Sequence, residues 1–488
     1  MDGGAPDTID LDEEGLHMPS TTSVTAHQAA ALDALRASDD DPDRSLLLQG
    51  GWVVDLVDIA PRRADVLIRG GVIEAIAPGI AERVGPDVIV VDVADAIVMP
   101  GLVDSHQHAW EGALRGVAPT VAFGGYWGLT HGGTAEHFTP DDMAVGELMS
   151  VAQAINAGTT TFIDNSHNHR TEAHADATIE ALRSTGIRAV FAAGPPGDGP
   201  HDDLFPDELL RLRDRWFPSD DGLVRLRAFD LYPSPDSLRW ATDHGLGVAA
   251  ELGPWAPAAG ELAASGALGP GQAFNHCAGL TADTWRALAD SGAAVNLVVR
   301  SDAQYGIGGL TPVLEAQAAG LRFGISSDNE TAYGHDLFTE MRVLLTVQRG
   351  LAFRRLGTDE DMPAPFEPWD VLRAATVGGA VNAGLEDRIG TLEPGKRADV
   401  VVLSLRAVHL HPWGSAVGTI VNFATPADVD AVFVDGRPLK WGGELVGVDY
   451  EALARRAVAS RERLLEAAGF SMEDARAGGI TPPIPPGF

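Results

Sequence analysis

Short apolar runs alternate with longer amphipathic stretches through the middle of the chain, over residues 98–390. Such alternation is typical of parallel βαβ units, in which each buried strand is followed by a helix that covers it. The predicted strands are Ile97–Val103, Thr159–Asp164, Arg188–Ala193, Val224–Leu231, Gly247–Leu252, Gln272–His276, Ala294–Val299 and Arg322–Ser327. Eight strands with helices between them predict an α/β fold, a TIM-type (β/α)8 barrel, whose reactive groups lie at the carboxyl ends of the strands.

A second pattern, of short β-like runs separated by glycine turns, is found on both sides of this region. Turn signals such as Gly50-Gly51 before the barrel and Asp435-Gly436 after it separate these runs. Because the two flanks have the same pattern, we expect one small β-sandwich domain built from residues 45–97 and 391–445. The barrel at 98–390 interrupts this domain.

The two ends of the chain differ from both patterns. Residues 1–44 are rich in acidic side chains and include one helical stretch, Val24–Ala37; they predict an acidic N-terminal arm that packs on a neighbouring subunit. Residues 446–488 predict a C-terminal helix, over Arg456–Ala468, and a proline-rich extended tail, Thr481–Phe488. An arm of this kind favours a homo-oligomer.

Composition and charge narrow the range of partners to small molecules. Of the 488 residues 45% are hydrophobic and 21% charged, and no apolar run approaches the ~20 residues that cross a bilayer. The net charge of −34 disfavours nucleic acids and anionic membranes, because both are bound by basic surfaces. The acidic start lacks the features of a signal peptide, so we expect a cytoplasmic protein. A single cysteine, Cys277, excludes intrachain disulfides and multi-cysteine metal clusters.

Polar side chains follow the first predicted barrel strand, where the sequence reads Asp104-Ser105-His106-Gln107-His108. Residues two apart on a strand point the same way, so the imidazoles of His106 and His108 can reach one cation. They closely follow an apolar run, which disfavours two ordinary surface histidines. The pair predicts an active site at the mouth of the barrel.

Other predicted strands end in groups that suit the same site. Strand five ends in Glu251, strand six in Asn275-His276-Cys277 and strand eight in Ser327-Asp328. Strand two runs into Asp164-Asn165-Ser166-His167, a candidate wall of a substrate pocket. Since the carboxyl ends of barrel strands converge, a carboxylate, an imidazole and a second carboxylate are expected to face the histidine pair.

Five segments together carry a specific, ordered set of motifs. They are Met99-Pro100-Gly101-Leu102-Val103-Asp104-Ser105-His106-Gln107-His108, Ala157-Gly158-Thr159-Thr160-Thr161, Asn275-His276-Cys277, Ser327-Asp328, and Gly390-Thr391-Leu392-Glu393-Pro394-Gly395-Lys396-Arg397-Ala398-Asp399. This set resembles the amidohydrolase superfamily, in particular the branch of cytosine deaminase, S-adenosylhomocysteine deaminase and atrazine chlorohydrolase. The resemblance covers nearly the whole chain after residue 45.

The resemblance implies a hydrolase that breaks a carbon–nitrogen or carbon–halogen bond of a small, heterocyclic molecule with metal-activated water. His106 and His108 would hold one divalent metal, zinc or alternatively iron, and Asp328 would be both a ligand and the base that deprotonates the water. Glu251 would relay protons to the leaving group, and His276 would orient the water or polarise the substrate. A bound metal makes this chemistry accessible because it lowers the pKa of its water from about 15.7 to about 7.

One position departs from the family pattern. In this branch a metal-binding histidine normally lies three residues before the glutamate of strand five, and here that residue is Val248. Three outcomes follow: His276 or Glu251 becomes a metal ligand, the metal is bound weakly by His106, His108 and Asp328, or no metal is bound. If a Val248→His variant gained metal occupancy, the native site would be a weakened version of the family's.

The two lysines of the chain, Lys396 and Lys440, lie outside the predicted barrel. Binuclear members of the family bridge their metals with a carboxylated lysine on strand four, so at most one metal is expected here.

Aromatic and polar residues after strands one, two, seven and eight are candidates for the substrate pocket, and their types suit a planar, polar or anionic substrate. The predicted set is Trp110, Trp127, His167, Arg300, Gln304, Tyr305 and Asn329, to which Arg115, Phe123 and Tyr126 are neighbours. The residues after strand seven are Arg300-Ser301-Asp302, where the deaminase branch often has Ser-Asn. That difference disfavours a standard nucleobase.

Three functions compete on these grounds. The first is the metal-dependent hydrolase just described. The second, prompted by Val248, is a metal-free lyase or isomerase that uses Glu251, His276 and Asp328 as acid–base groups. The third is a non-catalytic binding protein, which would leave the five converging polar residues unexplained.

Overall fold

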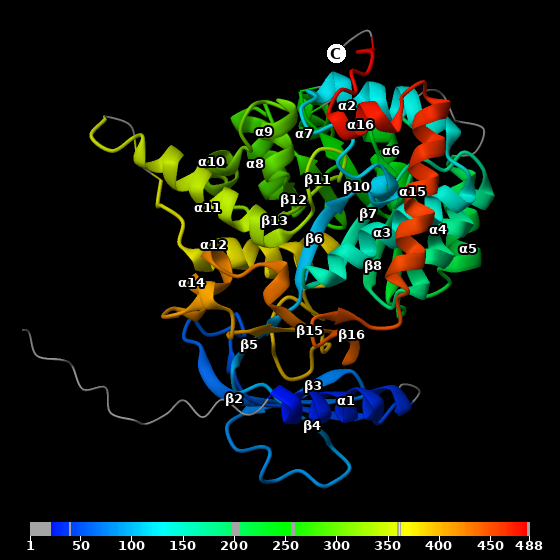
Figure 1. Cartoon of the computed structure of the whole chain (residues 1–488). Coiled ribbons are helices and arrows are strands. Elements are labelled where there is room, and N and C mark those ends of the chain that lie inside the picture. The colour runs from blue at the N-terminus through cyan, green and yellow to red at the C-terminus, as the bar shows by residue number, and fades with distance from the viewer. Residues whose placement is uncertain are drawn as a thin grey trace, which may run out of the picture.

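The computed structural model describes residues 21–38, 41–197, 205–254, 259–358, 361 and 363–485. A barrel of parallel strands wrapped by helices lies on a mixed β-sheet, and this sheet is built from both ends of the chain (Figure 1). None of the described helices combines the length and the apolar character that crossing a membrane requires.

The barrel consists of eight parallel strands that follow one another in chain order. They are β6 (Leu102–Gln107), β7 (Thr159–Ser166), β8 (Arg188–Ala193), β9 (Val224–Asp230), β10 (Gly247–Leu252), β11 (Gln272–His276), β12 (Ala294–Leu297) and β13 (Phe323–Ile325). The first and last strands meet just beyond β13, where Gln107 and Asp328 form a parallel bridge. The predicted eight-stranded barrel is therefore confirmed.

Helices cover the outside of the barrel. Those between the strands are α3 (Pro140–Asn156), α4 (Glu172–Ser184), α5 (Asp207–Trp216), α6 (Pro235–Asp243), α7 (Ala259–Ser265), α8 (Ala282–Ser291), α9 (Val299–Tyr305) and α10 (Val313–Ala318), followed after β13 by α11 (Leu337–Phe353), α12 (Pro368–Arg373) and α13 (Gly379–Ala383). Local sequence fixes several starts: Thr139 caps α3 by accepting a hydrogen bond from the Asp142 amide at 3.3 Å, and the Asp142 carboxylate accepts one from the Thr139 amide at 2.7 Å.

The connection from β6 to β7 is long and forms much of the barrel mouth. Its elements are η1 (Ala109–Leu114), α2 (Phe123–Leu129), η2 (Thr130–Thr134) and η3 (Ala135–His137). Trp110 and Leu129 from this connection pack with Leu464 and Ile480 from the C-terminal region. The C-terminal region thus holds the connection against the barrel.

The mixed sheet contains nine strands. They are β1 (Ser45–Val53), β2 (Arg62–Arg69), β3 (Val72–Ala77), β4 (Ile89–Asp92), β5 (Ala96–Pro100), β14 (Val400–Ser404), β15 (Val429–Val434), β16 (Arg437–Trp441) and β17 (Glu444–Leu445). Strand β5 lies between β1 and β14 and so joins the two flanks of the barrel.

Strand β5 also corrects the predicted start of the barrel. The apolar run Ile97–Val103 was expected to be one barrel strand, but Ile97–Pro100 pairs with the mixed sheet and β6 begins only at Leu102. The run is continuous because both segments are buried, although they belong to different sheets. As a result His106 lies on the first barrel strand itself and His108 directly after it.

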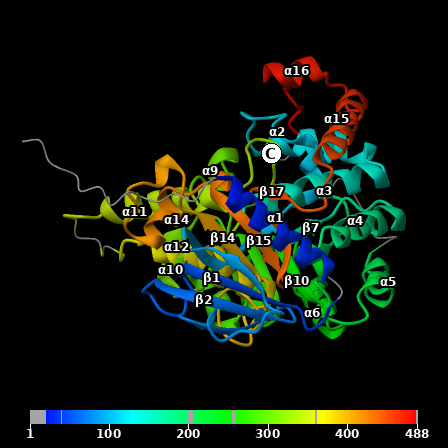
Figure 2. The same cartoon turned by 60° about the horizontal axis from the view of Figure 1, so that its bottom comes forward.

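The termini pack on the body of the chain. Helix α1 (Thr21–Ala37) lies across the mixed sheet, where Ala31 and Leu35 are buried in its core (Figure 2). This part of the predicted arm therefore contacts its own chain, while residues 1–20 lie outside the described residues. Helices α15 (Tyr450–Ala467) and α16 (Met472–Ala477) follow the sheet, and α15 packs on α3.

A buried ion-pair cluster connects the barrel to the mixed sheet. Arg188, at the start of β8, donates from Nε to the Asp399 carboxylate at 2.8 Å and also contacts Asp435. The side chains of Arg188 and Asp399 are 4% and 2% exposed, so neither charge is solvated. Burial alone would raise the pKa of Asp435, but the guanidiniums of Arg397 and Arg188 lower it.

Replacing Arg188 by alanine is expected to destabilise the protein by about 3–5 kcal/mol, because the Asp399 carboxylate would remain buried without a cation. Arg239→Ala, which breaks an exposed pair with Asp236, is the control and should cost less than ~1 kcal/mol. Urea denaturation measures both, and equal stability of the two variants would contradict this account.

The stability of the protein should also depend on pH through Asp435. Because the folded pKa of Asp435 lies below its unfolded value, its contribution to the free energy of unfolding is present above pH ~4 and is lost as the pH falls further.

Candidate functional site

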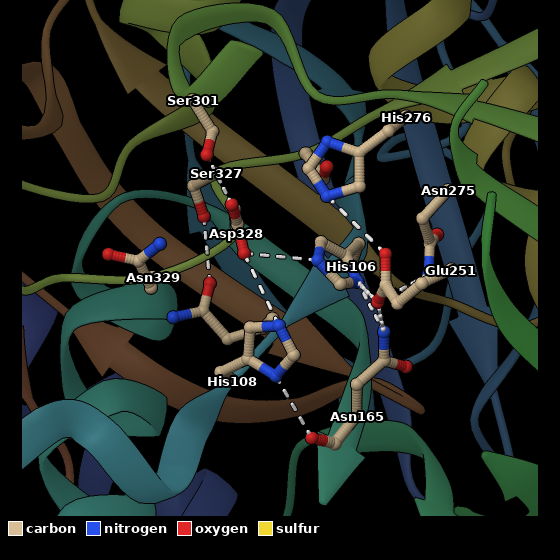
Figure 3. A network of polar contacts seen from close by, with 12 residues as sticks. His106, His108, Asn165, Glu251, Asn275, His276, Ser301, Ser327, Asp328 and Asn329 are labelled. Atoms are coloured by element: carbon tan, nitrogen blue, oxygen red, sulfur yellow. Dashed lines mark hydrogen bonds and ion pairs between the residues drawn. The ribbon is translucent and has the colours of Figure 1, made fainter. Parts of the chain in front are cut away.

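The seam at which the barrel closes brings the two histidines to an aspartate. Two backbone hydrogen bonds form this seam: the His106 carbonyl oxygen accepts from the Asp328 amide at 3.0 Å, and the His108 amide donates to the Asp328 carbonyl oxygen at 2.7 Å. The side chains then converge, with Asp328 Oδ1 at 3.0 Å from His106 Nε2 and 3.4 Å from His108 Nε2 (Figure 3). Closure of the barrel therefore assembles half of the site.

Two further residues complete the cluster from the opposite side. Glu251, near the end of β10, has Oε1 at 3.6 Å from His106 Nδ1 and Oε2 at 3.3 Å from His276 Nε2. His276 ends β11, which pairs with β10 in register so that Glu251 and Asn275 are neighbours. Figure 3 shows His106 between Asp328 on one side and Glu251 on the other. All these side chains are buried.

The orientation of Val248 changes the meaning of the missing histidine. Alternate residues of a strand face opposite sides, and Glu251 and Ala249 of β10 face the barrel interior. Val248 faces the other way, is 2% exposed and packs in the apolar layer between the barrel and its helices. A histidine at 248 would therefore point away from the site. On this backbone, Val248→His is therefore expected to add no ligand to the site.

The backbone is strained where two of the site residues leave their strands. His276 and Asp328 have φ values of 61° and 68°, and the neighbouring Cys277 has 58°, in the left-handed region that is uncommon for residues other than glycine. Such conformations persist only where surrounding contacts impose them, and they concentrate at functional sites.

Burial and charge set the protonation of the cluster. Burial lowers the pKa of His108 to about 3, assisted by the neighbouring His106. For His276 burial alone would lower the pKa, but a hydrogen bond from Nδ1 to Asp302 at 2.7 Å and the charges of Asp302 and Glu251 raise it to about 9. Burial would raise the pKa of Asp328, yet the surrounding histidines hold it well below its usual range. Asp328 is thus an anion and His108 a neutral imidazole at neutral pH.

Several polar residues position this cluster. Ser301 donates to Asp328 Oδ2, Asn275 donates to Glu251 Oε1 at 3.3 Å, and Asn165 contacts His106 Nδ1. Asp302 fixes the ring of His276 by accepting from Nδ1. The sequence pointed to Asp302 only as a departure from the usual Ser-Asn pair; its distance from His276 in the chain hid this role.

The cluster fits a divalent metal ion. Two groups of three donors, His106 with His108 and Glu251, and His106 with His276 and Asp328, each have ligand atoms within 4.8 Å of one another. Imidazole nitrogen and carboxylate oxygen are the donors that zinc and iron accept. Glu251 Oε2 is buried and has no hydrogen bond among the described residues, facing only His276 Nε2. A cation would satisfy this oxygen.

Beside the cluster is a pocket of about 530 Å³, including its open mouth. Its base is formed by His108, His167, Glu251, His276 and Asp328, and its walls by Phe123, Tyr126, Trp127, His131, Leu231, Tyr232, Tyr305 and Ile307. The rings of Trp127 and His131 are stacked with centroids 3.9 Å apart, and His131 stacks in turn on His167 at 5.0 Å. The pocket is thus an aromatic slot next to the donor cluster.

The predicted pocket residues fall into three groups. Trp127, His167 and Tyr305 line the pocket. Trp110 lies behind it, edge-on to His131 and His167, and Asn329 accepts the Tyr305 hydroxyl at 2.8 Å.

The two remaining predicted pocket residues point elsewhere. Arg300 pairs with Glu340 at 2.5 Å and donates to the Gly334 carbonyl at 2.7 Å. Gln304 donates to the Pro119 carbonyl at 2.8 Å. Both side chains are used to fix loops, so the described lining of the pocket contains neither.

Four lining residues were not among those proposed from the sequence: His131, Leu231, Tyr232 and Ile307. Leu231 and Tyr232 directly follow β9, so their position after a barrel strand was the available signal. His131 lies deep in the connection between β6 and β7, where nothing in the local pattern marks a side chain as facing the site.

Comparison with known proteins agrees with this geometry. The model of the amidohydrolase family matches residues 97–237 and 259–439. The chain is 29% identical over 397 residues to the 5-methylthioadenosine/S-adenosylhomocysteine deaminase of Desulforudis audaxviator, covering 77% of this chain and 89% of that protein.

Solved structures give the same result for the fold. An adenosine deaminase from Xanthomonas campestris with bound zinc has a TM-score of 0.76 at 25% identity over 86% of this chain and 98% of its own. Atrazine chlorohydrolase from Arthrobacter aurescens TC1, complexed with zinc, has a TM-score of 0.71 at 23% identity over 85% of this chain and all of its own. The chain belongs to the amidohydrolase family and is a hydrolytic enzyme.

Proposed function

We propose that the protein is a zinc-dependent hydrolase that displaces an amino group or a halide from a small heterocyclic ring. One observation carries this proposal: five buried donors, His106, His108, Glu251, His276 and Asp328, converge at the base of an aromatic slot. The ion is proposed to be zinc because two structural relatives hold it, with iron as the alternative. When bound, such an ion supplies Lewis acidity and makes water a nucleophile near neutral pH.

Each residue has a distinct part in this proposal. His106, His108 and Asp328 would hold the ion, and Glu251 would complete the set from the opposite side, taking the place of the family's histidine. Asp328 would also accept the proton of the attacking water, since it is anionic and its Oδ2 is held by Ser301.

His276 would deliver a proton or a hydrogen bond to the substrate. Its Nδ1 is committed to Asp302 at 2.7 Å, so the ring is fixed and Nε2 faces Glu251 and the pocket. His167 and Trp127, which are stacked on opposite faces of His131, would line the pocket beside the ring that reacts. Displacement of the leaving group thus needs only residues that line the pocket.

The metal-free alternative has no support among the relatives described above, which are named as deaminases and a chlorohydrolase. The donor set also argues against it, because Glu251 Oε2 lacks a hydrogen bond and two carboxylates lie beside His106.

Removal of the metal is expected to abolish activity. The purified protein should contain about one zinc per chain by elemental analysis and should release ammonia or chloride from aminopurine nucleosides, aminopyrimidines or chlorotriazines. Dialysis against 1,10-phenanthroline should stop turnover, and added zinc should restore it. Turnover by protein that elemental analysis shows to be metal-free would overturn the proposal.

We further propose a cytoplasmic homo-oligomer whose partners are small molecules rather than nucleic acids or membranes. The charge of −34 supports the exclusion of anionic polymers. Exposed apolar side chains near α14 (Ala416–Asn422), with Val408 89% and Phe423 57% exposed, support a subunit contact. Size-exclusion chromatography with light scattering tests the oligomer.

A further inference from the structure

The outer part of the pocket contains no arginine or lysine among its described lining residues. Above the donor cluster its walls are Phe123, Tyr126, Trp127, His131, Leu231, Tyr232, Tyr305 and Ile307. The residues that the structure does not describe contain no arginine or lysine in their sequence either. No undescribed segment can therefore supply a guanidinium or a lysine ammonium to a ligand.

The arginines nearest in sequence to the site are already neutralised. Arg115 pairs with Glu330, whose side chain is fully buried, and Arg300 pairs with Glu340 at 2.5 Å and stacks over Tyr333. Freeing either guanidinium would leave a buried carboxylate without its partner, which is strongly unfavourable. Neither arginine is available to a substrate.

Two of the three tyrosine hydroxyls of the pocket walls are committed as well. Tyr126 donates to Glu111 Oε1 at 2.8 Å, and Tyr305 donates to Asn329 Oδ1 at 2.8 Å. The third tyrosine, Tyr232, is 58% exposed and lies at the rim. An anionic group that passed the rim would lose its water and gain neither an arginine or lysine nor the hydroxyls of Tyr126 and Tyr305 in return.

We infer that the substrate is a planar heterocycle whose substituent is uncharged and apolar, and that congeners with a phosphate or carboxylate on that substituent are excluded. The inference rests on the proposed function and specifies its substrate class. It replaces the sequence-based expectation of a polar or anionic substrate, which depended on Arg300 facing the pocket. The ring lies beside the stack formed by Trp127, His131 and His167, and the substituent lies against Leu231 and Ile307.

The test uses two pairs of compounds that share a ring and differ in charge. The first pair is 5′-deoxy-5′-methylthioadenosine and adenosine 5′-monophosphate. The second is a chloro-bis(alkylamino)-1,3,5-triazine and its analogue with one alkyl chain ending in a carboxylate. Binding to the zinc-loaded protein is measured by calorimetry and turnover by release of ammonia or chloride. In at least one pair the neutral member should bind or react at least ~100-fold better than the anionic one.

A charge variant at the rim separates electrostatics from shape. Tyr232→Arg should selectively improve the anionic member, by about tenfold or more, whereas Tyr232→Gln, which is uncharged, should not. Equal or better binding of the anionic members by the unmodified protein would overturn the inference, as would binding of neither member of either pair. If neutral members bind selectively but none is turned over, the proposed function fails while the inference about charge stands.

Discussion

Glu251→His is expected to retain about one metal ion per chain. Val248→His is expected to show no more metal occupancy or affinity than the unmodified protein. In the first variant the new imidazole starts from the strand face that points at His106 and His276, so a nitrogen replaces a carboxylate oxygen as a donor. In the second the imidazole would enter the apolar layer outside the barrel, where Val248 is 2% exposed. Elemental analysis and competition titration with a zinc-binding dye measure occupancy and affinity.

Two further variants make this comparison decisive. Glu251→Gln keeps the size of the side chain but removes the anion, and should weaken metal binding by more than ~100-fold, since even residues that only orient a metal ligand are worth 10–100-fold. Val248→His should unfold more readily by about 1–3 kcal/mol, the usual cost of a buried polar group without a partner. Val248→Leu is its control for size. Metal gained by Val248→His and lost by Glu251→His together would show that β10 has a different register.

The same strand shows what the sequence could and could not predict. The order of strands and the convergence of His106, His108, Glu251, His276 and Asp328 followed from counting apolar runs and from the rule that barrel strands end at one mouth. The family spacing then marked Val248 as a lost ligand. A regular strand turns residues three apart to opposite faces, so that spacing could not by itself say which face Val248 would occupy.

Loop residues were harder to place than strand residues. Arg300 and Gln304 follow a barrel strand, as Tyr305 does, yet only Tyr305 lines the pocket, because they lie on the short helix α9 and its faces point in different directions. Arg300 also has Glu340, from α11, as a buried partner 40 residues away. Pairings between distant segments of this kind have no signature in the local pattern.

Asp328→Asn is expected to lower kcat by ~10²–10⁴-fold, the range for loss of a general base, and further if zinc is lost with it. Asparagine has the shape of aspartate and tolerates the φ of 68° found here, so the fold should survive. The amide can still occupy the place between His106 and His108 but cannot accept a proton from water. Rates are compared at saturating zinc, with occupancy determined on the same samples.

The control for this variant is Asp104→Asn, on the same barrel strand as His106. Asp104 is equally buried, but its oxygens accept from the amide and hydroxyl of Ser327 and, at 3.4 Å, from the backbone amide of His106, and they do not bind a side chain of the donor cluster. Removing its charge tests whether any buried carboxylate at this end of the barrel would produce the loss. A far smaller effect on kcat than that of Asp328→Asn is expected. If the two variants lost activity equally at full zinc occupancy, Asp328 would be a structural anion and the proton would need another acceptor, for which Glu251 is the remaining carboxylate in the pocket.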